Sequence, residues 1–207
     1  MNAEKRAIWV FGDYRNYFQN RVTLQLLSRA RELAVKIDAE VCAVVFGYWT
    51  DEWVDDALLQ NPTFCGVVGE YIAHGADKVY LTDHPRLAAY SMETYVLLME
   101  RLAKREKPEI ILIGATTFGR EFASRVAKRL RTGLSADCIG LEINDDGLLV
   151  QMAPSFGGNL VAEIVTPERR PQMATVRPGT FQETPHDTLR TGRVVKEIGR
   201  ASCRERV

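Results

Sequence analysis

Two hydrophobic patterns alternate along the first 130 residues of the chain. In the first, nearly every position of a short run is apolar; such runs lie at residues 7–12, 40–47, 77–82 and 109–114. Runs of this kind are typical of strands buried on both faces of a parallel sheet. In the second, apolar residues recur every three or four positions. This spacing predicts amphipathic helices at residues 22–37, 66–74, 87–105 and 118–131.

The pattern changes after Gly133, where strands follow one another without helices. Residues 135–143 and 148–152 flank Asn-Asp-Asp-Gly at 144–147, which predicts a β-hairpin. Residues 160–165 and 172–176 predict two more strands. The order predicts an α/β protein: a three-layer α/β/α domain with a mainly parallel, Rossmann-like sheet. The C-terminal antiparallel strands either extend that sheet or form a small one beside it.

Composition and charge exclude several classes of function. The 207 residues include 27 Lys or Arg and 27 Asp or Glu, so no excess of positive charge favours a nucleic acid as partner. No stretch approaches the roughly 18 apolar residues that membrane insertion requires, and we expect no secretory signal. The cysteines form no CxxC pair, which favours a reducing, cytoplasmic compartment: Cys42, Cys65, Cys138 and Cys203.

Motifs for catalysis and metal binding are missing from the sequence. The chain has no GxGxxG, P-loop or GxSxG pattern. Its three histidines lack the spacing of a helical metal site: His74, His84 and His186. We therefore expect no catalytic residue and no metal ligand.

The turn between the strand at 109–114 and the next helix is a candidate anion site. Backbone N–H groups at a helix start are unpaired, and the helix dipole favours negative charge. Thr116 or Thr117 could cap this helix. Gly119 could let a phosphate approach, and Arg120 could supply the counter-charge. The structural alternative is that a threonine caps the helix, worth about 1 kcal/mol, and that Arg120 faces solvent or a partner subunit.

Four segments carry a resemblance to a known family. They are Gly-Ala-Thr-Thr-Phe-Gly-Arg-Glu at 114–121, Thr-Gly-Leu-Ser-Ala-Asp-Cys at 132–138, Pro-Ser-Phe-Gly-Gly-Asn at 154–159, and Arg-Pro-Gln-Met-Ala-Thr-Val-Arg-Pro-Gly-Thr-Phe at 170–181. With them, residues 8–181 resemble the N-terminal domain of the electron transfer flavoprotein alpha subunit. The resemblance implies an adenine nucleotide alpha hydrolase-like fold and an electron carrier subunit, with no enzymatic activity of its own.

The resemblance also implies cofactors and partners. It implies a heterodimer with a beta subunit, which carries AMP or, in bifurcating members, a second FAD. The alpha subunit holds its FAD in a C-terminal domain that has no counterpart here, so no flavin-binding residue can be assigned. Electrons would pass between flavin dehydrogenases, such as acyl-CoA dehydrogenases, and an acceptor. This chain would be the scaffold that docks the beta subunit. The rival hypotheses are a free-standing adenine-nucleotide-binding domain and a purely structural interaction domain.

The turn after the strand at 172–176 is the predicted interface. Pro178 fixes φ and Gly179 permits a positive φ, so the turn places Arg177 and Phe181 where the chain would leave for the flavin domain. The Arg177 guanidinium could pair with a carboxylate across the interface or lie near the flavin. Its alternative is a structural turn with an exposed arginine. Phe156 is likewise either an interface contact or part of a tight loop.

Three units are predicted along the chain. Residues 1–185 form the N-terminal-type domain of the family, and residues 186–196 begin the linker to the flavin domain. Residues 197–207 have neither strand alternation nor an apolar helical face. We interpret them as a non-native tail, with a natural charged tail as the alternative.

Overall fold

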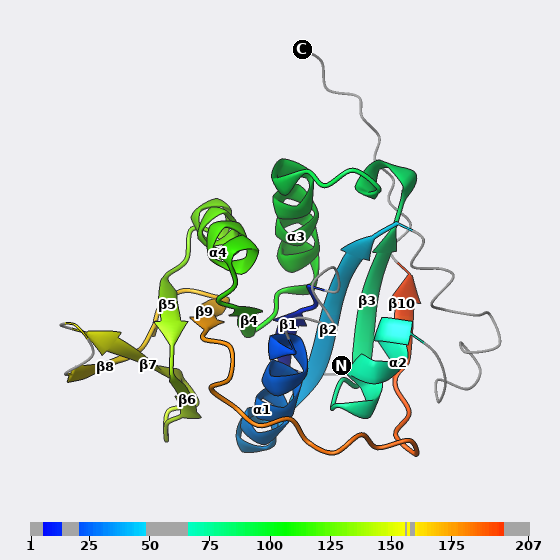
Figure 1. The fold of residues 1–207 in the computed structure, drawn as a ribbon. Helices are drawn as coiled ribbons and strands as arrows, with labels where there is room; N and C mark the ends of the chain where they lie inside the picture. The colour runs from blue at the N-terminus through cyan, green and yellow to red at the C-terminus, as the bar shows by residue number, and fades with distance from the viewer. Residues whose placement is uncertain (1–5, 14–20, 49–65, 156, 158–159, 197–207) are drawn as a thin grey trace, which may run out of the picture.

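The computed structural model describes residues 6–13, 21–48, 66–155, 157 and 160–196. Seven parallel strands form the main sheet in the order β10-β3-β2-β1-β4-β9-β5 (Figure 1). They are β1 (Arg6–Phe11), β2 (Ala39–Gly47), β3 (Lys78–Asp83), β4 (Ile110–Gly114), β5 (Leu134–Cys138), β9 (Gln172–Val176) and β10 (Arg193–Lys196). The predicted α/β class with a mainly parallel sheet is confirmed.

Helices cover both faces of the main sheet. They are α1 (Val22–Ile37), α2 (Gly66–Ala73), α3 (Met92–Glu106) and α4 (Thr117–Leu130), with a short 3-10 turn η3 (Pro85–Leu87) before α3. Alternate side chains of β1 enter different cores, because successive strand residues point to opposite faces. Ile8 and Val10 pack with α1 and α2. Trp9 and Phe11 pack with α3 and α4, so both faces of the sheet are buried.

A small antiparallel sheet lies beside the main one (Figure 1). Its strands, in order, are β6 (Gly140–Ile143), β7 (Leu149–Ser155) and β8 (Leu160–Ile164). The predicted hairpin at 144–147 is confirmed. The Asn144 side-chain oxygen accepts from the backbone N–H groups of Asp146 and Leu148, at 3.1 and 2.9 Å, and Gly147 takes a positive φ of 74°.

Two predicted elements differ from the structure. The helix predicted at 87–105 begins at Met92, because the Ser91 hydroxyl caps it by accepting from Thr94 N at 3.4 Å. The strand predicted at 135–143 is two strands in different sheets, β5 and β6. Asp137, with a φ of 56°, lies at an irregularity of β5 between Ser135 and Cys138. The chain leaves the main sheet only after Cys138, which still pairs with Val176.

Residues 177–192, called here the crossing segment, pass from β9 over α1 and α2 to the opposite edge of the main sheet (Figure 1). Glu183 pairs with Arg21 at 2.7 Å, and Thr184 N donates to Ser28 Oγ at 2.9 Å. The segment leads into β10, which pairs with β3. The interpretation of residues 186–196 as the start of a linker stays a prediction. The structure adds that residues 193–196 belong to the main sheet.

Asp77 fixes the end of the crossing segment. Its carboxylate accepts from Val41 N at 3.0 Å and pairs with Arg190 at 2.7 Å and with Arg31. Its backbone N–H donates to Val41 O at 2.8 Å, and its carbonyl accepts from Arg193 N at 2.8 Å. One residue therefore joins α1, β2, the crossing segment and β10.

Candidate functional site

The predicted anion site is the turn between β4 and α4. Thr116 is the helix cap: its hydroxyl accepts from Gly119 N at 2.9 Å, and its carbonyl accepts from Arg120 N at 3.0 Å. Thr117 and Arg120 are exposed. Of the two threonines that the sequence offered as caps, Thr116 therefore fills that role, as the structural alternative expected.

Gly119 has a packing role that the sequence did not indicate. A Cβ built on it would lie 1.9 Å from the Gly114 carbonyl oxygen, far inside any permitted contact. The side of Gly119 that lacks a Cβ thus faces the backbone of β4, where the sequence suggested room for a phosphate. The close approach that this glycine permits is between α4 and the main sheet.

Two glycines are tightly packed at the point where a sheet of this topology usually binds ligands. From β1 the chain continues to β2 and β3 on one side of it, while β4 lies on its other side. The strand order therefore reverses between β1 and β4, and ligands of such sheets bind in a crevice outside the carboxyl ends of these two strands. A Cβ on Gly12 would lie 2.5 Å from the ring of Tyr71, and one on Gly114 would lie 2.4 Å from Val22. Among the described residues, these buried side chains therefore pack directly against the two glycines at the strand ends.

Arg177 is paired within the chain. Its guanidinium bonds the carboxylate of Asp137 at 2.5 Å, and its backbone N–H donates to the Cys138 carbonyl at 3.0 Å. The hydrogen bond from Arg177 holds the pKa of Asp137 below its usual value, and the charge of Arg120 acts in the same direction. The structure thus pairs one predicted residue, Arg177, with a carboxylate that sequence reasoning missed. Nothing in the strand pattern around Asp137 distinguished it.

The other predicted interface residues lie along the start of the crossing segment. Pro178 and Gly179 are exposed, and Gly179 has a φ of 80° and donates its N–H to Gln25 Oε1 at 2.9 Å. Phe181 is half-buried against the core, with the Arg29 guanidinium 5.3 Å from its ring centre. Phe181 therefore fastens the segment to α1. Phe156 lies outside the described residues.

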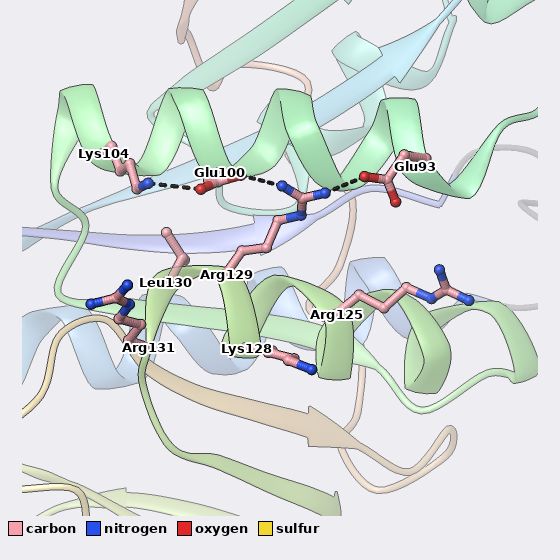
Figure 2. A pocket seen from close by; sticks show the side chains of 8 residues that line it. All are labelled: Glu93, Glu100, Lys104, Arg125, Lys128, Arg129, Leu130 and Arg131. Carbon is pink, nitrogen blue, oxygen red and sulfur yellow. Dashed lines mark hydrogen bonds and ion pairs between the residues drawn. The ribbon is translucent and has the colours of Figure 1, made fainter. Parts of the chain in front are cut away.

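A groove lies between α3 and α4 (Figure 2), and four basic residues at the C-terminal half of α4 line it: Arg125, Lys128, Arg129 and Arg131. Arg129 reaches across to Glu93 and to Glu100, the latter at 3.3 Å. Lys104 bonds Glu100 at 2.7 Å, and this hydrogen bond lowers the pKa of Glu100. The groove is thus crossed by its own chain of ion pairs, which ties the two helices together.

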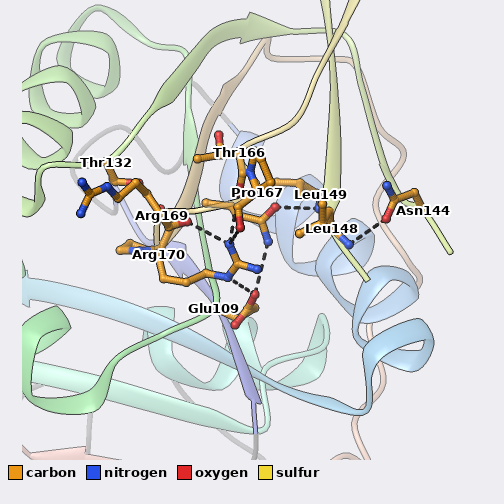
Figure 3. Close-up of polar contacts among 11 residues, drawn as sticks. Glu109, Thr132, Asn144, Leu148, Leu149, Thr166, Pro167, Arg169 and Arg170 are labelled. Atoms are coloured by element: carbon orange, nitrogen blue, oxygen red, sulfur yellow. Dashed lines mark hydrogen bonds and ion pairs between the residues drawn. The ribbon is translucent and has the colours of Figure 1, made fainter. Parts of the chain in front are cut away.

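A polar network holds the small sheet against the main one (Figure 3). The buried Gln172, at the start of β9, accepts from Leu149 N at 2.8 Å and lies 3.4 Å from Glu109. Arg170 pairs with Glu109 and donates to the carbonyls of Thr166 and Pro167, at 3.2 and 3.1 Å. These contacts join the start of β7 and the chain after β8 to the starts of β4 and β9.

His74 is the most buried histidine, and the crossing segment packs on it. Its Nε2 lies 3.5 Å from Glu70, whose other oxygen lies 3.6 Å from His186, and the two imidazole rings meet edge to face at 5.7 Å. Within the described ranges, no three His, Cys, Asp or Glu side chains could hold a metal ion. No described helix is long and apolar enough to cross a membrane.

Burial of His74 predicts a pH-dependent stability. Burial lowers the pKa of His74 below the usual 6.5, and the nearby charges of His186 and Arg21 lower it further. The charges of Glu70 and Glu183 raise the pKa but do not outweigh these effects. The unfolded chain therefore binds the proton more readily than the folded one. We expect the free energy of unfolding to fall as the pH drops below about 6.5, and His74→Gln to lose part of this fall. Urea unfolding at a series of pH values from 7 to 5 measures the free energy of unfolding of the wild-type chain and of His74→Gln. An equal pH dependence of the two would contradict the role of His74.

Comparison with known proteins identifies the family. The model of the electron transfer flavoprotein domain matches residues 8–198. An electron transfer flavoprotein subunit alpha from Thermoanaerobacterium thermosaccharolyticum is 44% identical over 191 residues, which cover 92% of this chain and 54% of that protein. One from Clostridium acetobutylicum is 41% identical, covering 88% and 51%.

A further relative is the LctC subunit of a lactate dehydrogenase (NAD(+),ferredoxin) from Acetobacterium woodii. It is 40% identical, covering 85% of this chain and 39% of that protein. The chain spans about half the length of the first two relatives. The family match covers most of the chain and includes both sheets, and the chain therefore belongs to the electron transfer flavoprotein domain family.

Proposed function

We propose that this chain is the platform domain of the alpha subunit of a heterodimeric electron transfer flavoprotein. It docks the beta subunit and supports a flavin domain, and it holds no redox cofactor itself. The observation that carries the proposal is the packing at the carboxyl ends of β1 and β4. Tyr71 and Val22 pack against the sides of Gly12 and Gly114 that lack a Cβ, so these two glycines leave no room there for the close approach of a phosphate.

The cofactors belong elsewhere in this proposal. FAD lies in the remaining part of the full-length alpha subunit, and AMP or a second FAD lies in the beta subunit. The flavin supplies the electron transfer, while the protein sets distances and electrostatics around it. No side chain of this chain acts as a catalytic acid or base. The pairing of Arg177 with Asp137 supports a structural role for that arginine.

The proposed electron donors are flavin dehydrogenases, such as acyl-CoA dehydrogenases, and the proposed compartment is the cytoplasm. The names of two relatives as alpha subunits support the carrier role. One relative is named as a subunit of a dehydrogenase that uses NAD(+) and ferredoxin. The proposal therefore covers an ordinary carrier and a member of a flavin-based bifurcating complex.

Ligand binding by the purified 207-residue chain tests this function. We expect a colourless protein that shows no heat of binding with AMP, ATP or FAD in isothermal titration calorimetry. The co-expressed beta subunit serves as the positive control and should retain AMP or FAD through purification. A yellow chain with a flavin absorption band would contradict the proposal. Saturable AMP or ATP binding by the chain alone would instead support a free-standing adenine-nucleotide-binding domain.

A further inference from the structure

The groove between α3 and α4 concentrates positive charge in a chain whose net formal charge is zero. Its lining contains five cationic side chains and two carboxylates, a net formal charge of +3. The groove has a volume of about 820 Å³, which suits a ligand much larger than a single ion. A hollow lined mainly by one sign of charge attracts a partner of the opposite sign.

Two of the five cations are available to a partner. The other three pair with carboxylates of the same two helices. Lys128 and Arg131 are exposed at the C-terminal end of α4 (Figure 2), and within the described ranges neither forms an ion pair. Both carboxylates of the lining already have cationic partners, so the charges of Lys128 and Arg131 are not neutralised within the groove.

The carboxylates in the lining favour an acidic protein over a polyphosphate. Glu93 is 55% exposed, so it would repel the continuous negative charge of a nucleic acid lying along the groove. A protein surface can place carboxylates opposite Lys128 and Arg131 and a neutral or basic group opposite Glu93. Complementarity of this mixed kind selects the partner and fixes its orientation.

The polarity of the groove indicates brief binding. Of the described residues that line it, Leu130 alone is apolar, and its side chain is half-buried. Permanent subunit contacts have a large apolar centre, whereas encounters between electron-transfer proteins are small. Opposite charges on the two partners speed such encounters. The groove therefore fits a partner that binds and leaves quickly.

We propose that the groove between α3 and α4 is the electrostatic docking site of a small, acidic electron-transfer protein. This inference rests on the proposed function, because a carrier must meet its redox partner repeatedly. Lys128 and Arg131 pair with carboxylates of that partner. The ion pairs of Arg129 with Glu93 and Glu100 hold the two helices in place beneath it. Binding is fast and weakens as the salt concentration rises.

Charge reversal tests the site. The probe is a two-iron ferredoxin of negative net charge, and surface plasmon resonance measures its binding to the 207-residue chain. At low salt we expect Lys128→Glu to raise Kd about threefold, and Lys128→Glu/Arg131→Glu about tenfold or more, mainly through slower association. The matched control is Lys36→Glu, at an exposed lysine in the last turn of α1 as Lys128 is in the last turn of α4. It should leave Kd unchanged, and circular dichroism and Tm must show all variants folded.

Salt dependence provides a second measurement, which needs no variant. Raising the salt concentration from about 20 to about 200 mM should slow association with the wild-type chain about tenfold, since salt screens exposed charges. Absence of ferredoxin binding at low salt, or association that does not depend on salt, would overturn the proposal. So would an unchanged Kd for the double variant, or an equal loss in Lys36→Glu.

Two further probes separate the proposed partner from other polyanions and from general stickiness. Heparin, a polyanion without carboxylates in a protein surface, should bind more weakly than ferredoxin, and so should cytochrome c, a small redox protein of positive net charge. Tighter binding of either probe would contradict the proposal. All of these outcomes leave the platform function standing, because titration with AMP, ATP and FAD tests that function separately.

Discussion

Gly119→Ala should lower the free energy of unfolding by about 3 kcal/mol, the upper end for overpacking. The added methyl would lie 1.9 Å from the Gly114 carbonyl oxygen, a backbone atom that no rotamer change can move. Helix propensity alone predicts the opposite sign, since Ala is favoured over Gly within helices by about 1 kcal/mol. The clash is the larger effect, because α4 must move away from β4 to relieve it. Urea unfolding followed by circular dichroism measures the change.

Gly133→Ala is the matched control for this substitution. A Cβ there would lie 3.2 Å from the Thr166 hydroxyl, a side chain that can rotate away. We expect the control to change the free energy of unfolding by less than about 1 kcal/mol. Equal stability of Gly119→Ala and the wild-type chain would show that the contact between α4 and β4 is not tight, and would remove the packing account of this glycine.

Asp77→Ala should cost about 2 kcal/mol of stability and loosen β10. The substitution leaves two guanidinium groups, Arg31 and Arg190, without their shared carboxylate, and leaves Val41 N without an acceptor. Breaking a fully buried ion pair costs about 3–5 kcal/mol. The Asp77 side chain is 31% exposed, so water screens part of the loss. Relative to the wild-type chain, the substitution should therefore speed up hydrogen exchange in β10 and the crossing segment more than in β1.

Two comparisons make the Asp77 result interpretable. Asp77→Asn keeps an acceptor for Val41 N but removes the charge, so its loss of stability should be intermediate. Asp145→Ala, at an exposed hairpin carboxylate, should change stability by less than about 0.5 kcal/mol. A loss in Asp77→Ala no greater than in Asp145→Ala would mean that the crossing segment is held without this residue.

The pH dependence of the Asp77 contribution has a definite sign. Burial raises the pKa of this carboxyl, but hydrogen bonds from Arg31 and Val41 N outweigh it and hold the pKa below the usual 3.8. The folded state therefore favours the ionised carboxylate. This contribution is present above about pH 4 and is lost as the pH falls through the lowered value.

Hydrophobic pattern was sufficient to predict the layers of the fold. The strands at β1, β2, β3, β4 and β9 and helices α1, α2 and α4 are confirmed near their predicted bounds. Pattern failed where one apolar run crosses from one sheet to another. Residues 134–138 and 140–143 belong to different sheets, and β5 is already irregular at Asp137, whose φ is positive. The side-chain alternation of the run predicted a single strand.

The candidate site was predicted less well than the fold. The sequence placed Thr116, Arg120 and Arg177 at strand ends, where they are, and offered Thr116 as a helix cap, which the structure confirms. It missed Asp137 as the partner of Arg177, because the two are 40 positions apart and meet only where β5 lies beside β9. The sequence also suggested that Gly119 lets a phosphate approach, whereas the structure shows that Gly119 packs against Gly114.

The sequence by itself determined the fold class, the succession of elements and membership of the family, because each depends on residue spacing and local motifs. The tertiary structure decided which strands are neighbours, that residues 177–192 cross to the far edge of the main sheet, and that β8 is the outer strand of the small sheet with exposed apolar side chains. Spacing along the chain specifies which side of a strand is apolar. Whether another element covers that side depends on contacts between residues far apart in sequence.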